Sequence, residues 1–326
     1  MDPCGSLPRR ATDVLHADEI RALTRPSDLA GALVVLGTWA GIAATFALVA
    51  LWPHPLTILV ALVILGGRHM ALAVLMHETA HRSLFASRRL GEWVGRWLCA
   101  APGGNDLVRY RVHHLAHHAH TGTERDPDIA LTRPFPITGR SLARKLLRDL
   151  SGLTGLRRVV GILLMDIGVL GYTASSDPRP VPREQRSARS MLQGLLTRTG
   201  PTLVANAVLL AVLTAVGHPA LYLLWVVSYL TTYSVFLRIR SIAEHACTQG
   251  GPNPFLNTRT ILAGTLARLT VAPVRVNYHL EHHLLMTVPY HRLPQLHARL
   301  RERGVFEHAA LAPSYRAVLT RATSRG

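Results

Sequence analysis

The chain has 326 residues, a formal net charge of +17 and 48% hydrophobic residues, with a mean hydropathy of +0.20. Its three cysteines are far apart and form no CxxC pair, which argues against a disulfide framework and a cysteine zinc site. The charge is compatible with a nucleic-acid-binding protein, and equally with a membrane protein that has basic cytoplasmic loops. Eighteen histidines are the outlier of the composition.

Taken in chain order, residues 1–29 are polar and lack the apolar core of a signal peptide, so they are predicted to form a cytoplasmic segment. Residues 30–52 carry no charge and are long enough to cross a bilayer core of about 30 Å. A proline-containing turn leads into a second apolar stretch over 56–76, interrupted only around Arg68 and His69. The two stretches predict a transmembrane hairpin whose ends return to one side.

The next region, residues 77–200, is rich in arginine and is therefore predicted to be cytoplasmic. Within it, 90–100 has an apolar face with two tryptophans and is predicted to lie in the membrane interface. Residues 159–172 are apolar but too short to span easily, which favours an interfacial or re-entrant helix. Residues 177–189 are typical of a polar loop.

A second hairpin is predicted from 201–217 and 220–237, which flank a Gly-His-Pro turn. Residues 241–326 are predicted to be cytoplasmic and to end in a basic tail over 301–326. The sequence therefore predicts an all-α membrane protein with two transmembrane helical hairpins, four spans in total. Both termini and a helical cap are expected on the cytoplasmic side, and the bacterial inner membrane is the expected location.

The histidines form three clusters on the predicted cytoplasmic side. The spacings i, i+4 and i, i+3, i+4 place each cluster on one helix face. The three clusters are His77 and His81 in HETAH, His114, His117 and His118 in HLAHH, and His279, His282 and His283 in HLEHH. Eight imidazoles exceed the four ligands of one zinc ion and suit two transition-metal ions. Imidazole binds iron, copper, zinc and nickel, so the ligand type does not select the metal.

These boxes, in this order beside paired hydrophobic hairpins, resemble the membrane fatty acid desaturase family. YRVHHLAHHAHTGTERDPD is similar to its second box, NYHLEHHLLMTVPYHRLPQLH to its third, and RSIAEH to a segment after the fourth span that often carries a further histidine. The resemblance covers roughly residues 30–300, which form the predicted desaturase-like domain. It implies an all-helical membrane domain with a non-haem di-iron centre, two iron ions that activate O2.

The resemblance also implies the site residues. The expected ligands are His77, His81, His114, His117, His118, His245, His279, His282 and His283, and Asn277 is expected to hold a water on one metal. The neighbouring carboxylates could orient ligating histidines through the second ring nitrogen; a solvated charge is the alternative reading. These carboxylates are Glu78, Glu244, Glu281, Asp126 and Asp128.

The remaining histidines near the boxes carry weaker signals. His69 is as compatible with a neutral histidine bonded to a backbone carbonyl as with a role in the bundle. His113 and His120 flank the second box off its consensus positions. His291 and His297 follow the third box and are expected at the surface or behind the ligands.

The implied chemistry is removal of hydrogen from an unactivated C–H bond of an apolar substrate that enters from the lipid. Desaturation of a fatty acyl chain, lipid-linked or as a thioester, is the leading prediction. Hydroxylation, alkene-forming decarboxylation and ketolation of a carotenoid ring stay open as alternatives. The chain has no HPGG-type haem stretch, no CxxC motif and no dinucleotide fingerprint. An external electron donor, ferredoxin or cytochrome b5-like, with its reductase is therefore expected.

Two rival classes are less compatible with the sequence. A histidine-rich metal transporter would place ionisable ligands inside its spans, whereas these spans hold few apart from Arg68 and His69. A nucleic-acid-binding protein would interleave its basic patch with aromatics or a known module, and none is evident. The arginine-rich face could steer an acidic electron donor, but setting topology and touching anionic lipid explain the larger part of it.

Overall fold

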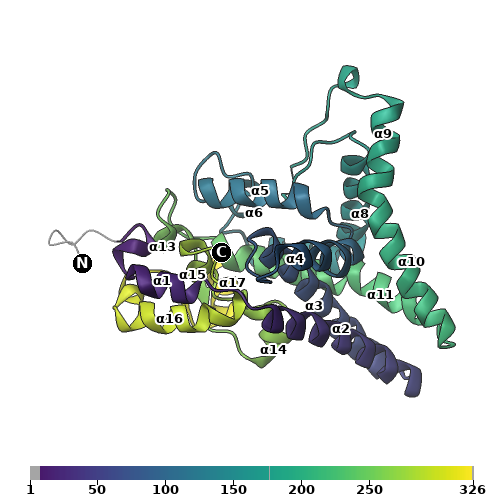
Figure 1. Cartoon of the computed structure of the whole chain (residues 1–326), viewed down its shortest axis with the longest axis horizontal. Helices are drawn as coiled ribbons and strands as arrows, with labels where there is room; N and C mark the ends of the chain where they lie inside the picture. Colours follow the sequence, from purple (N-terminus) through teal and green to yellow (C-terminus); the bar gives the residue numbers. More distant parts are fainter. Residues whose placement is uncertain (1–7, 176, 325–326) are drawn as a thin grey trace.

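The computed structural model describes residues 8–175 and 177–324, and this part of the chain is mostly helical with almost no sheet (Figure 1). Four helices in it are long and apolar enough to cross a membrane. They are α2 (Asp28–Leu51), α3 (Pro55–Ala80), the run Ala188–Ala215 and the run Leu221–His245. In Figure 1 helices α2, α10 and α11 extend toward one end of the molecule, and α1, α13, α15 and α16 gather at the other.

Helices α2 and α3 pack against each other and are joined by the short turn Trp52–His54. Pro55 begins α3 because a proline at the first helical position loses no hydrogen bond. The first half of α3 exposes leucines, with Leu56 63% and Leu59 61% exposed. Almost every residue from Leu65 to Ala80 is buried. The apolar first half is thus suited to lipid, while the second half runs into the protein and carries the first histidine box.

The third helix begins earlier than the sequence predicted. It comprises α9 (Ala188–Gly194), the π-helical η5 (Leu195–Thr199) and α10 (Gly200–Ala215). The prediction of a start at residue 201 is therefore wrong by about a dozen residues. Ser187 caps the helix by accepting from the Ser190 amide, and this cap explains why the polar end of the predicted loop continues into a helix.

The fourth helix continues past its predicted end at residue 237. It consists of α11 (Leu221–Leu230) and α12 (Thr232–His245), with a local break at Thr231. Arg238 pairs with Asp149 and Arg240 with Glu244. Because these arginines find carboxylate partners, their charges do not end the helix, and α12 reaches His245.

Shorter helices lie between the second and third spans. They are α4 (Arg88–Val94), the π-helical η2 (Gly95–Ala100), α5 (Leu107–His120), α6 (Ile129–Thr132), α7 (Gly139–Leu150) and α8 (Leu153–Asp166). Helix α8 contains only the first part of the apolar stretch predicted at 159–172, because it starts earlier and ends at Asp166. Its exposed Leu156, Val160 and Leu163 are compatible with contact to the bilayer.

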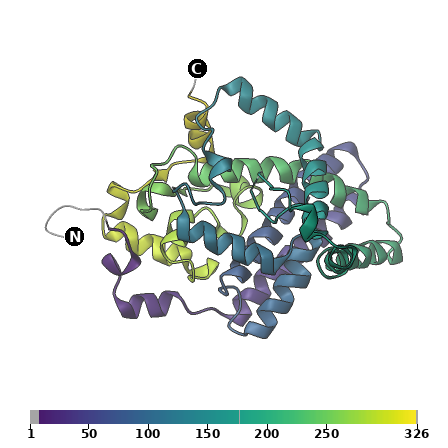
Figure 2. The same cartoon turned by 90° about the horizontal axis from the view of Figure 1, so that it is seen from above.

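The C-terminal region, together with the N-terminal helix, forms the end opposite the spans. Its elements are α1 (Ala17–Leu23), α13 (Pro254–Asn257), α14 (Thr265–Leu269), α15 (His279–Leu284), α16 (Leu293–Glu302) and α17 (Tyr315–Ala322). One departure from the all-α prediction is a parallel pair of short strands, β1 (Thr260–Ile261) and β2 (Leu311–Ala312). Seen from above, the N-terminal helix lies beside the C-terminal helices (Figure 2), where Glu19 pairs with Arg299 and Arg303.

Candidate metal centre

Four helices bring the three histidine boxes and His245 together. The first box lies at the buried end of α3, the second on α5, the third on α15, and His245 ends α12. Helix α15 is held in place by Leu280, which is fully buried in a core with Phe255 and Leu296. The leucine-rich third box therefore uses alternate sides of one short helix for the core and for the histidines.

The nine predicted histidines converge, and their nitrogens form two neighbouring groups. One group contains His77, His81, His114, His118 and His282, and the other contains His117, His245 and His283. Within each group the candidate ligand atoms lie within 4.8 Å of one another. The ninth, His279, joins the second group, with its Nε2 2.8 Å from Nε2 of His245. The rings of His118 and His283 stack at 4.1 Å between centroids and link the two groups.

Several Nε2 atoms face each other across the cluster. Nε2 of His118 lies 3.1 Å from Nε2 of both His114 and His282. Two neutral imidazoles that meet in this way can share at most one proton. The ring nitrogens of His77 and His81 are buried and have no hydrogen-bond partner among the described residues. Buried polar atoms are normally paired, so this arrangement of lone pairs fits a positive ion better than it fits a protein core.

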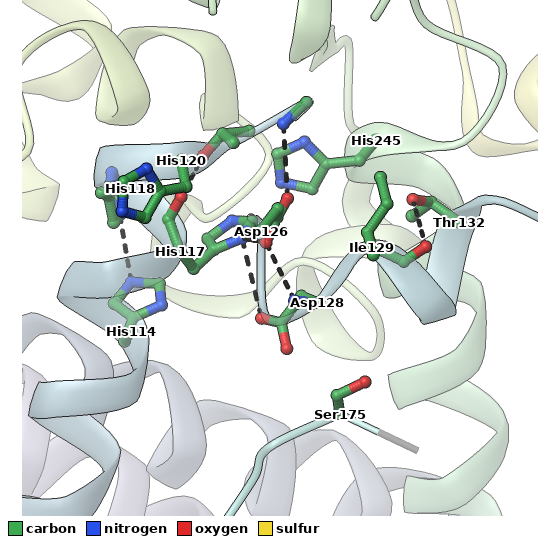
Figure 3. A network of polar contacts seen from close by, with 12 residues as sticks. His114, His117, His118, His120, Asp126, Asp128, Ile129, Thr132, Ser175 and His245 are labelled. Carbon is green, nitrogen blue, oxygen red and sulfur yellow. Dashed lines mark hydrogen bonds and ion pairs between the residues drawn. The ribbon is translucent and has the colours of Figure 1, made fainter. Parts of the chain in front are cut away.

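The Nδ1 atoms of three rings face protein acceptors instead. Figure 3 shows His117 beside Asp126, whose Oδ1 lies 2.8 Å from Nδ1. Nδ1 of His245 lies 3.1 Å from the carbonyl oxygen of Asn257, and Nδ1 of His279 lies 3.5 Å from Glu244. A histidine that ligates a metal commonly donates its other N–H to such an acceptor, which fixes the tautomer. For His117 and His245, whose Nδ1 atoms have hydrogen-bond partners, Nε2 is thus the free ligand atom.

Burial makes most of the cluster neutral. It lowers the pKa of His81 to about 3, and burial together with neighbouring histidines lowers the pKa of His114, His118 and His282 well below 6.5. Neutral imidazole is the form that binds metals. His117 is the exception: burial opposes its charged form, but the hydrogen bond to Asp126 and nearby carboxylates outweigh it and raise its pKa.

The other predicted partners differ in how closely they approach the cluster. Glu78 has one carboxylate oxygen 3.7 Å from Nδ1 of His77, and its other oxygen accepts from Ser83 and the Tyr290 amide. Asp128 lies 2.9 Å from His113 and 3.8 Å from His117. Asn277 donates its side-chain N–H to the carbonyl of Ile261, and its role toward a metal-bound water stays a prediction.

Glu281 departs from the expectation that it supports a box histidine. Its carboxylate binds His297 and accepts from the Thr260 hydroxyl. The reason is its place on α15, where it points toward α16 and β1 rather than toward the cluster. His297, expected near the surface or behind the ligands, is thereby tied to the third box through Glu281.

His69 lies outside the histidine cluster and contacts the backbone. Nε2 of His69 lies 3.1 Å from the carbonyl oxygen of Trp225, as expected for a neutral histidine bonded to the backbone.

Two residues that contact the cluster were not predicted from the sequence. They are Tyr110, which stacks on His114 with ring centroids 5.2 Å apart, and Asn257, whose carbonyl oxygen lies next to His245. Tyr110 precedes His114 by one helical turn, so its spacing was a usable signal; Asn257 stands in no motif that points to the site.

The donor set fits transition-metal ions. All the converging atoms are imidazole nitrogens. Burial keeps His81, His114, His118 and His282 neutral by lowering their pKa values. Protein acceptors already occupy the Nδ1 atoms of His117 and His245. The part of the chain that the structure describes therefore combines a buried histidine cluster with four helices able to span a membrane. These features define a membrane protein with a candidate metal centre.

Comparison with known proteins gives the family. The model of the fatty acid desaturase family matches residues 52–315, and the chain belongs to this family. It is also 28% identical over 273 residues to dihydrorhizobitoxine desaturase of Bradyrhizobium elkanii, an alignment that covers 82% of this chain and 74% of that protein. The protein is thus an oxidoreductase of the desaturase type, as the histidine boxes predicted.

Proposed function

We propose that this protein introduces a double bond into a fatty acyl chain, using O2 and a di-iron centre held by its histidine cluster. The observation that carries the proposal is the pair of adjacent histidine groups, five and three residues, in a chain of the desaturase family. Two groups suit two metal ions better than one, because a single ion rarely takes more than six ligands.

In this proposal the first ion is held by His77, His81, His114, His118 and His282, and the second by His117, His245, His279 and His283. Bound iron supplies the redox chemistry with O2 that amino-acid side chains lack. The chain's own residues hold the ligands ready: Asp126, Glu244 and the Asn257 carbonyl orient three rings, and Tyr110 supports a fourth. Preorganised ligands lower the reorganisation that metal binding requires.

The reaction balances with an external reductant. The substrate loses two hydrogen atoms from adjacent carbons, and O2 is reduced to two waters with two electrons and two protons. A ferredoxin or a cytochrome b5-like protein with its reductase supplies the electrons. The arginine-rich cytoplasmic surface favours an acidic donor, and the apolar spans let the substrate enter from the bilayer of the bacterial inner membrane.

The test is expression in a bacterial host with a matched ferredoxin system and analysis of total fatty acids by GC–MS. The control is His282→Ala, produced to the same level. A new unsaturated acyl product that the control lacks supports the proposal and gives the bond position. A hydroxylated, keto or shortened product replaces the reaction and keeps the metal centre. No product and no bound iron would bring the metal-transporter alternative forward.

The relative from Bradyrhizobium elkanii adds a second candidate substrate. The name of this relative gives dihydrorhizobitoxine as its substrate, so fatty acyl chains are not the only substrates to test. Polar extracts of the same cultures, supplied with dihydrorhizobitoxine, should be compared by LC–MS. A product two hydrogens lighter, without any change in fatty acids, would favour this second candidate.

A further inference from the structure

A buried arginine stands directly behind the second histidine group. Arg259 is 3% exposed, and its guanidinium donates to the carbonyls of Ala243 and Ala246 at 2.9 Å and of Cys247 at 3.3 Å. Within the described part of the chain no carboxylate lies at ion-pair distance from it. Burial lowers its pKa to about 10, so it remains charged at neutral pH.

Ala243 lies in the last turn of α12, the helix that carries His245, while Ala246 is its C-cap and Cys247 follows directly. The last carbonyls of a helix have no partner within the helix and carry partial negative charge, so a cation is stabilised there. The chain leaves the helix abruptly, since Cys247 has a φ of 56°, a conformation that non-glycine residues rarely adopt. The rigid fork of a guanidinium can bind several carbonyls at once and hold this exit in place.

The residues around Arg259 link the same point to the other boxes. The carbonyl oxygen of Asn257 accepts from Nδ1 of His245 at 3.1 Å. The side-chain N–H of Asn257 donates to the carbonyl of Thr121, at the end of α5, 2.8 Å away. Thr260 donates to Glu281 on the third-box helix. The segment 257–260 thus contacts the end of α12, the end of α5 and α15. Arg259 is its charged centre.

A similar contact occurs at the first box. Arg111 donates to the carbonyls of Thr79 and Ala80 at the end of α3, between His77 and the turn that follows. Unlike Arg259, it also pairs with a carboxylate, Glu92. Two helices that carry cluster histidines therefore end on an arginine from another segment.

From this geometry we infer that Arg259 is a positioning residue: it fixes the end of α12 so that His245 faces His117 and His283 and completes the second metal site. The inference rests on the proposed metal centre. Loss of the guanidinium would free the α12 exit, and His245 would lose the fixed relation between its ring and Asn257. The affinity for metal at the second site should therefore fall, while the geometry of the five-histidine group stays unchanged.

The experiment titrates purified, metal-free protein with Fe²⁺ under anaerobic conditions and measures affinity and stoichiometry for Arg259→Met, His245→Ala and the double variant. We expect about 10- to 100-fold weaker binding at one of two sites in either single variant. The double variant should be no weaker than the weaker single variant, because both changes remove the same contact. Arg186→Met is the matched control, since Arg186 also binds backbone carbonyls, those of Val169 and Val181.

Each other result decides against the inference. If Arg259→Met binds Fe²⁺ with wild-type affinity and His245→Ala does not, the second metal site stands but Arg259 has no positioning role. Additive losses show that Arg259 does not act through His245. Wild-type binding in His245→Ala removes the proposed second site and the role of Arg259 with it. If Arg259→Met fails to fold, Arg259→Lys is measured instead; wild-type affinity per folded molecule with only a lower Tm would mean a purely structural role.

Discussion

The histidine cluster is costly for the protein to keep without metal, and the cost depends on pH. His114, His118, His279, His282 and His283 all have pKa values well below 6.5 because they are buried among one another. Above pH 6.5 these rings are neutral in both folded and unfolded chains. Below it the unfolded chain binds protons that the folded chain excludes, so folding stability falls.

We therefore expect metal-free protein in detergent to lose stability as the pH falls below 6.5. Each such histidine contributes up to about 1.4 kcal/mol per pH unit until its own folded-state pKa is reached. The check is the Tm measured between about pH 8 and about pH 5, with and without Fe²⁺. A Tm of the metal-free protein that does not change over this range would contradict the neutral, buried state of the cluster.

Unlike its neighbours, His117 has a raised pKa, because the carboxylate of Asp126 stabilises its charged form. Asp126 also orients the His117 ring. Asp126→Asn should weaken Fe²⁺ binding by about 10-fold or more, because the ring loses its charged partner at 2.8 Å. The lower proton competition at His117 offsets only part of this loss. Asp18→Asn, on the exposed surface beside Arg21, is the control. Equal affinity in the two variants would refute the orienting role of Asp126.

At the scale of elements, the buried half of α3 depends on two glycines that admit its neighbours. A Cβ at Gly66 would lie 2.3 Å from the Thr232 hydroxyl, and one at Gly67 would lie 2.0 Å from the carbonyl oxygen of Leu269. Such distances are shorter than any real contact. These glycines let α12 and α14 pack closely against α3. Helix α12 carries His245 and α3 carries the first histidine box, so this close packing helps to position both parts of the cluster.

Gly67→Ala should therefore destabilise the protein by about 1–3 kcal/mol, since the neighbour is backbone and cannot move aside cheaply. Gly37→Ala on α2 is the matched control, because a Cβ there has no atom within 4 Å. The control should be neutral, or more stable by up to about 1 kcal/mol from helix propensity. The measurement is the Tm of both variants in detergent; equal values would argue against close packing at Gly67.

At the scale of the whole molecule, we propose that all four candidate helices cross the membrane, an even number that would leave both termini on one side. The arginine excess in the connecting region and the C-terminal part favours the cytoplasm for that side. In this proposal the histidine cluster faces the compartment of the proposed electron donor.

A membrane-impermeant thiol reagent tests this topology in intact cells. Cysteines placed in the two inter-span turns, His54→Cys and His218→Cys, should be labelled without lysis. Arg301→Cys, in the basic tail, should be labelled only after lysis, and the unmodified chain provides the background from its own cysteines. Labelling of Arg301→Cys in intact cells would reverse the proposed orientation.

The sequence by itself determined the class of the protein and the membership of the cluster. Residue spacing on helices is a local property, so HETAH, HLAHH and HLEHH each predicted one histidine face, and long uncharged stretches predicted the spans. The nine named histidines are the ones that the structure brings together. Their roles as iron ligands stay a prediction.

Only the tertiary structure decided which groups support those histidines, because the partners come from distant segments. Glu281 sits inside a box yet turns to His297, since a residue's direction depends on what packs on each helix face. The helix start at Ala188 and the helix end at His245 were also not evident from the sequence, because a serine cap and two partly buried ion pairs outweigh local polarity. Arg259 reaches the end of α12 only through the folded chain, and no spacing in the sequence shows that contact.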